Sequence, residues 1–101
     1  MTNRNFKIDF TESSLQQLTD LKNDPARRGI AKAVVKSIGF MTENLKHPSL
    51  HTHKYDELAG PNGEEVFESY AQNKTPGAYR IFWYYGPGRH RITVVEITSH
   101  S

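Results

Sequence analysis

The chain has 101 residues, a net charge of +2 and no cysteine, which suits one domain and excludes a disulfide framework, a thiolate zinc site and a cysteine nucleophile. A mean hydropathy of −0.70, with no apolar run near the roughly 20 residues of a membrane span, excludes a spanning helix. The opening segment lacks the apolar stretch of a signal peptide, so we expect a soluble cytoplasmic protein spanning 1–101 as a single domain.

The first predicted element is a half-buried strand over Phe6–Phe10, where apolar and polar residues alternate. Thr11 is a typical helix N-cap, and a short helix is expected from there to Asn23. Phe10 and Leu15 occupy the positions of a hydrophobic staple around this cap. The apolar stripe of the helix is predicted to consist of Leu15, Leu18 and Leu21.

A second and longer helix is predicted from Pro25 to Asn44. Asp24 is a capping residue, and Pro25 suits the first helical position, where no backbone N–H is needed. Apolar residues then recur every three or four positions, which places them on one face. These residues are Ile30, Val34, Ile38, Met41 and Leu45. Pro48 ends the helical pattern.

The second half of the chain predicts strands. Residues 46–63 are expected to form a long irregular stretch that ends in the turn 60–63. Strand-like segments follow at 65–71, 78–85 and 91–98, joined by short turns that favour an antiparallel meander. The order β-α-α-β-β-β predicts an α+β domain with two helices packed on a four-stranded, mainly antiparallel sheet.

The irregular stretch concentrates side chains that could carry chemistry. His51, His53 and Lys54 lie within four residues of one another, and long loops in small domains are often functional. Exposed loop histidines without a function are one interpretation. A metal site is another, with His100 as a third ligand, although zinc usually requires further ligands at a recognisable spacing.

Arg80 interrupts an otherwise aromatic and aliphatic strand. A period of two places it with Phe82 and Tyr84 on one face, opposite the bulkier face that should cover the helices. We therefore expect Arg80 on the open face of the sheet. It could pair with Glu68 of the neighbouring strand, or its fork of N–H donors could hold a phosphate.

These residue types together suit RNA cleavage by attack of a 2′-OH on the adjacent phosphate. The reaction needs a base, an acid and a cation near the developing negative charge, which histidine, arginine and lysine supply. His51 or His53, Lys54, Arg80 and His100 would provide all three without a metal or another cofactor.

The sequence resembles the RelE/ParE superfamily of toxins from type II toxin-antitoxin systems, with the YoeB, YafQ and RelE branches nearest. The resemblance covers nearly the whole chain and is carried by the element order together with four passages. These are His47–Leu50, Leu58–Gly60, Tyr79–Trp83 and Ile97–His100.

The resemblance implies an endoribonuclease that cleaves mRNA at the ribosome. It assigns Arg80 to the scissile phosphate, His100 to general acid or base chemistry, and His51 to a further catalytic role. His53, Lys54, Glu68 and Tyr84 are the expected substrate-binding residues. The same fold also hosts ParE-like proteins that inhibit DNA gyrase, and a member that only binds a partner is a third hypothesis.

The resemblance also implies a cognate antitoxin as partner. Charge supports an anionic partner for the first half of the chain, because residues 1–55 carry nine Lys/Arg and five Asp/Glu, a balance of +4. Residues 56–101 carry four and six, a balance of −2. The expected contact region includes Arg27, Arg28, Lys32 and Lys36, although a merely solvated helix surface would show the same pattern.

Overall fold

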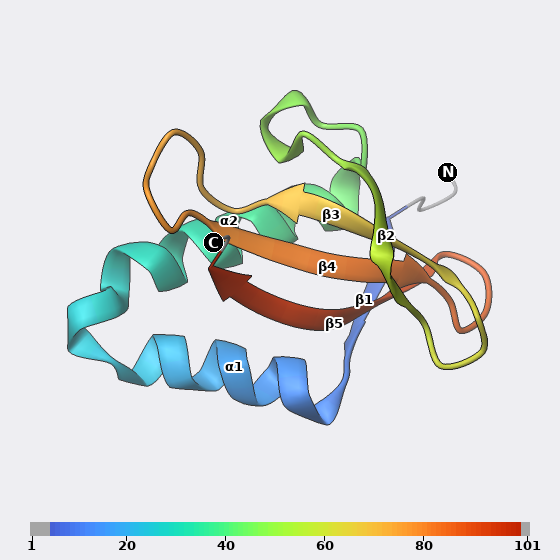
Figure 1. Ribbon diagram of the computed structural model, residues 1–101, viewed down its shortest axis with the longest axis horizontal. Coiled ribbons are helices and arrows are strands. Elements are labelled where there is room, and N and C mark those ends of the chain that lie inside the picture. The colour runs from blue at the N-terminus through green and yellow to red at the C-terminus, as the bar shows by residue number, and fades with distance from the viewer. Residues whose placement is uncertain (1–4, 100–101) are drawn as a thin grey trace.

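The computed structural model describes residues 5–99 of the chain, and two helices cover one face of a five-stranded sheet (Figure 1). The sheet order is β1-β5-β4-β3-β2, with β1 parallel to β5 and the other pairs antiparallel. The α+β architecture predicted from the sequence is confirmed. The elements are β1 (Lys7–Phe10), α1 (Glu12–Asn23), η1 (Pro25–Arg27), α2 (Arg28–Glu43), η2 (Pro48–Leu50), β2 (His53–Ala59), β3 (Glu65–Tyr70), β4 (Tyr79–Tyr85) and β5 (Arg91–Ser99).

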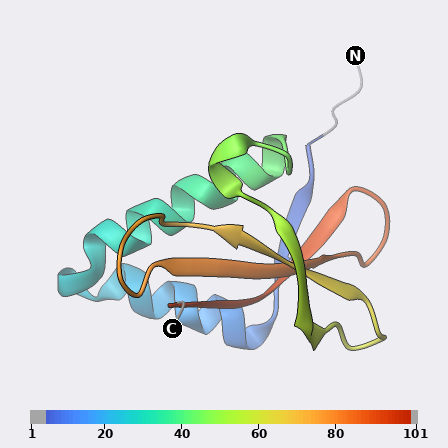
Figure 2. The same ribbon diagram turned by 45° about the horizontal axis from the view of Figure 1, so that its top comes forward.

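The prediction of four strands was wrong by one, because β2 lies in the stretch expected to be irregular. Most side chains of β2 are exposed, so the strand lacks the alternation of apolar and polar residues that reveals a half-buried strand. Its backbone pairs with β3, and the turn 60–63 joins the two strands. Both views show β2 crossing steeply over the sheet face opposite the helices (Figures 1 and 2).

Thr11 caps α1 as expected, but Asp24 caps the short helix η1, and α2 begins only at Arg28 with no side-chain cap, so the prediction of one helix from Pro25 was wrong at its start. The Thr11 side chain accepts a hydrogen bond from the Ser14 N–H, and the Asp24 side chain accepts one from the Ala26 N–H. The predicted stripe of α1 was wrong at Leu15, which is exposed. Ser14 is buried in its place, because its hydroxyl donates to the Val94 carbonyl of β5 at 2.7 Å. Neither helix within residues 5–99 has the length and apolarity needed to cross a membrane.

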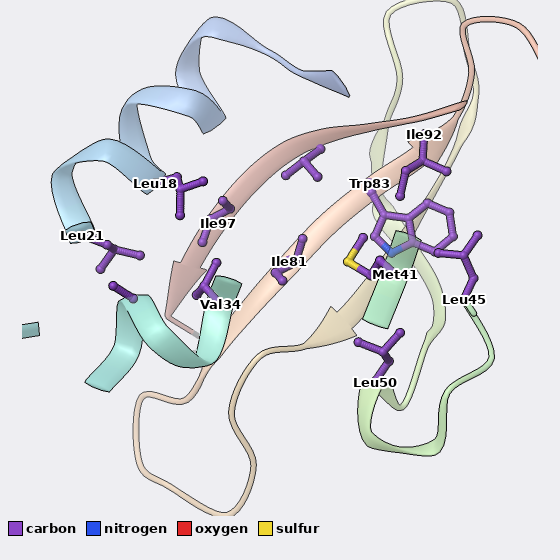
Figure 3. Packing of buried hydrophobic residues seen from close by; sticks show 12 residues of the cluster. Leu18, Leu21, Val34, Met41, Leu45, Leu50, Ile81, Trp83, Ile92 and Ile97 are labelled. Atoms are coloured by element: carbon purple, nitrogen blue, oxygen red, sulfur yellow. The ribbon is translucent and has the colours of Figure 1, made fainter. Parts of the chain in front are cut away.

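The main core lies between the helices and the sheet (Figure 3). Leu18 and Leu21 of α1 and Val34 and Met41 of α2 meet the inward side chains of β4 and β5. The strand residues buried against them are Ile81, Trp83, Ile92, Val94 and Ile97. The helical spacing on α1 and α2, and the alternation of buried residues along β4 and the first part of β5, explain why these elements were predictable from the sequence.

A chain of hydrogen bonds extends from the core to the segment before β2. The buried Trp83 Nε1–H donates to the Ser69 hydroxyl at 2.9 Å, and this hydroxyl lies 2.7 Å from that of Thr52. Ser69 is fully buried. The contacts connect β4, β3 and the residue between His51 and His53, so the core fixes the position of both histidines.

We expect Ser69→Ala to destabilise the protein by about 1–3 kcal/mol, because the buried indole N–H would lose its acceptor. The check is the free energy of unfolding in urea. Ser13→Ala on the exposed surface of α1 is the matched control and should change that energy by less than about 0.5 kcal/mol. An unchanged midpoint for Ser69→Ala would show that the hydrogen-bond chain contributes nothing to stability.

Candidate functional site

Side chains from β2 and β3 meet on the sheet face opposite the helices. His53 and Glu68 are cross-strand partners, and His53 Nε2 lies 2.7 Å from Glu68 Oε1. The other ring nitrogen, Nδ1, lies 2.9 Å from the His51 carbonyl oxygen. A carbonyl oxygen can only accept, so Nδ1 carries a hydrogen and donates it. Both nitrogens of His53 are therefore held, while about half of its side chain stays exposed.

One proton must lie between His53 Nε2 and Glu68 Oε1, since otherwise two acceptors would face each other. With the proton on nitrogen, the ring is an imidazolium cation beside a carboxylate, and the hydrogen bond is charge-assisted. Glu68 is only 4 % exposed, and a buried carboxylate is costly unless cations or N–H donors compensate it. This side chain is therefore suited to holding positive groups in place.

Arg80 is the second partner of Glu68, and its guanidinium is permanently charged. Its Nε lies 3.6 Å from Glu68 Oε2, and its Nη1 donates to the Gln72 carbonyl at 2.7 Å. The guanidinium carbon lies 3.6 Å from the centre of the Tyr70 ring, a cation–π contact. Arg80 shares the face of Glu68 and Phe82, opposite the helices, as expected, but this face is not open there, since the residue is only 8 % exposed.

Tyr70 connects the members of this cluster, and it was absent from the residues proposed from the sequence. It pairs with Arg80 across β3 and β4. Its ring centre lies 5.0 Å from that of His51 and 6.0 Å from that of His53. His51 is exposed and has a left-handed backbone with φ of 47°. We call His51, His53, Glu68, Tyr70 and Arg80 the histidine–arginine cluster.

Three residues of the sequence-based site are not placed in this cluster. Lys54 pairs instead with Glu65 at 2.8 Å, and this hydrogen bond and the charge of Glu65 raise the pKa of Lys54. Tyr84 is buried with Val66 and Phe82 in a small second core. His100 lies outside the described residues. Within residues 5–99, no three side chains of His, Cys, Asp or Glu gather in a way that could hold a metal ion.

An open groove of about 580 Å³ lies on the same side of the sheet, between β2 and the end of β5. Its lining includes Tyr55, Phe82, Thr98 and the two carboxylates Glu57 and Glu96. We call it the acidic groove. Burial, followed by the negative charges of Glu57, Glu68 and Glu96, raises the pKa of Tyr55. The phenol therefore stays protonated near neutral pH, and the groove disfavours anions.

The comparison with known proteins concerns the fold. The sequence matches no protein-family model and no curated protein. The structure is similar to the YoeB/ParE toxin from Agrobacterium tumefaciens, with a TM-score of 0.67 and 14% identity over 95% of this chain and 100% of that one. The chain has the fold of the YoeB and RelE toxins.

Two further solved structures show the same likeness. The YoeB dimer from Staphylococcus aureus has a TM-score of 0.67 and 8% identity, over 96% of this chain and 99% of that one. The archaeal RelE–RelB complex from Pyrococcus horikoshii has a TM-score of 0.62 and 9% identity, with 94% of both chains covered. The resemblance identified in the sequence is thus confirmed at the level of the fold.

We expect Tyr55 to ionise above the ordinary phenol pKa of 10.0, since both burial and the nearby carboxylates disfavour the phenolate. Absorbance at alkaline pH, compared between the wild-type chain and Tyr55→Phe, isolates this titration. Replacing both Glu57 and Glu96 with Gln should move the titration towards lower pH. The same double exchange in a Tyr55→Phe background is the control, and a Tyr55 titration at or below the ordinary value would contradict the acidic character of the groove.

Proposed function

We propose that this chain is a toxin of a type II toxin-antitoxin system and an endoribonuclease that cleaves mRNA. The observation that carries the proposal is the histidine–arginine cluster, in which buried Glu68 binds His53 and Arg80 next to the exposed ring of His51. The likeness in fold to YoeB and RelE toxins supports it. A proton-exchanging imidazole beside fixed positive charge suits phosphoryl chemistry.

In the proposed reaction, His51 removes the proton from a ribose 2′-OH. The resulting oxygen attacks the adjacent phosphorus, and the bond from phosphorus to the 5′-oxygen of the next nucleotide breaks. Arg80 and His53 stabilise the negative charge on the phosphate oxygens, and His100 gives a proton to the leaving 5′-oxygen. The products are a 2′,3′-cyclic phosphate and a 5′-hydroxyl end. Glu68 and Tyr70 position the cations and take no part in the proton transfers.

We also propose that a partner antitoxin neutralises this toxin, and the archaeal RelE–RelB complex, which is similar in fold, supports a protein partner. Exposed Arg28, Lys32 and Lys36 of α2, with exposed Val35 beside them, form a surface suited to an anionic, partly apolar segment. Arg27 is engaged within the chain, because it pairs with Asp24 at 3.4 Å and donates to the Tyr79 hydroxyl.

Induced expression in a bacterium should arrest growth and produce mRNA fragments with 5′-hydroxyl ends, mapped by sequencing. We expect His51→Asn to lower the cleavage rate by about 10²–10⁴-fold, because asparagine cannot exchange a proton near neutral pH. His90→Asn is the matched control. His90 is an exposed histidine with a left-handed backbone at φ of 58°, against 47° for His51, and asparagine adopts this conformation readily.

Cleavage by His51→Asn at the wild-type rate would contradict the role of His51. Arrested growth with intact mRNA and inhibited gyrase supercoiling would overturn the nuclease proposal in favour of a ParE-like activity. The absence of any toxicity from the wild-type chain would instead favour a protein that acts only by binding a partner.

A further inference from the structure

A second open groove lies beside the histidine–arginine cluster and differs from the acidic groove in charge. It has a volume of about 420 Å³ and lies between the segment that follows α2, the middle of β3 and the end of β4. Its apolar surface includes Leu45, Phe67 and Tyr85, and its rim includes Lys46, His47, His51 and His53. None of the described residues that line it is Asp or Glu. We call it the aromatic groove.

The ring of Tyr85 is both exposed and fixed in direction. The residue is 51 % exposed, a large fraction for an aromatic side chain beside the core. Its ring lies edge-on against Phe67 at 5.5 Å and against Trp83 at 5.0 Å between centroids. Trp83 is fully buried and stacks on Phe67. Little conformational freedom is therefore lost when a flat molecule stacks on Tyr85.

The rim of the aromatic groove suits an anion. Lys46 is exposed, and His47 is held by stacking on Phe40 at 3.9 Å between ring centroids. The Nδ1 of His47 accepts a hydrogen bond from the Ser49 N–H. A neutral His47 must then carry its proton on Nε2, where it is a hydrogen-bond donor. A flat aromatic surface with ammonium and N–H donors around it matches a nucleobase and its phosphate.

The position of the groove connects it with the proposed reaction. His51 and His53 belong both to its rim and to the histidine–arginine cluster. A polyanion that crosses the cluster meets carboxylates on the side of the acidic groove, whereas it meets the Lys46 ammonium and the N–H donor of His47 on the side of the aromatic groove. This distribution of charge therefore directs an RNA strand towards Tyr85.

We propose that the aromatic groove binds one nucleotide of single-stranded RNA next to the cleaved bond, with the base stacked on Tyr85 and a phosphate at Lys46 and His47. The inference rests on the proposed function for its substrate class. It adds contacts from Tyr85, Lys46 and His47, which take no part in the proposed chemistry of cleavage.

The test is the binding of a fluorescein-labelled 12-nucleotide single-stranded RNA that carries a 2′-O-methyl group on every ribose, which prevents cleavage. Fluorescence anisotropy gives the Kd. We expect Tyr85→Ala to raise the Kd about tenfold or more, since stacking on an aromatic side chain supplies much of the affinity for single strands. Tyr85→Phe retains the ring and should bind within about twofold of wild type. Leu15→Ala, at another exposed apolar residue, is the matched control.

Salt dependence tests the phosphate contact separately. Lys46→Ala should weaken binding and lower the slope of log Kd against log salt concentration by about 0.7, the value for one phosphate contact on a single strand. Lys22→Ala, on the exposed surface of α1, should change neither quantity. Circular dichroism of each variant verifies the fold, and Tyr85→Phe keeps the test valid if Tyr85→Ala is destabilised.

Equal affinity of wild type and Tyr85→Ala for this RNA would overturn the inference, and so would a wild-type chain that does not bind it. Loss of antitoxin binding in Tyr85→Ala, with RNA binding unchanged, would assign the groove to a protein partner and would also overturn it. The two proposals fail separately. A wild-type chain that cleaves RNA with no effect of Tyr85→Ala on affinity refutes only the groove, whereas weakened binding without any cleavage by wild type refutes only the nuclease.

Discussion

The buried hydroxyl of Ser69 is the contact on which the rest of the candidate site depends. It accepts a hydrogen bond from the indole N–H of the only tryptophan, Trp83, and lies within hydrogen-bond distance of the Thr52 hydroxyl. The main core and the functional face are thus joined by one small polar group near the end of β3. A hydroxyl suits this place because it can accept and donate at once, so neither the indole N–H nor Thr52 is left to water. The backbone between the two histidines is therefore tied to the core, while Glu68 and the His51 carbonyl hold the ring of His53.

The same arrangement explains how β2, whose side chains are mostly exposed, can carry an ordered site. Only Tyr55 of β2 packs closely on the sheet, with its ring 4.7 Å from that of Phe82. The rest of β2 is held by backbone pairing with β3 and by polar contacts, among which the Glu68 carboxylate binds His53. Replacing apolar packing with charged contacts leaves the strand accessible to a ligand while its direction stays fixed.

The sequence predicted most of the fold, because α1 and α2 bury apolar residues at helical spacing and strands β3 to β5 are rich in branched and aromatic residues. It did not predict β2, whose polar side chains carry no such period, and this omission affected the site. Because this segment was predicted to be a loop, His53 and Lys54 were expected to contribute to one site. In a strand, however, successive side chains point to opposite faces of the sheet. The pairing of Arg80 with Glu68 was among the predicted alternatives. Tyr70 was missed because its contact with Arg80 depends on the register of β3 and β4.

The parallel pairing of β1 with β5 sets the order in which this chain can fold. Ser14 and Gln17 of α1 bond to the backbone of Val94 and Ile97, 80 residues further along. The strands β2, β3 and β4 are adjacent in sequence and can pair early. By contrast, β1 and α1 cannot make their contacts with β5 until β5 has been synthesised. Contacts over such separations form slowly. A nascent chain that stops before Arg91 would therefore contain the strands of the histidine–arginine cluster. It would lack β5, the strand on which α1 packs.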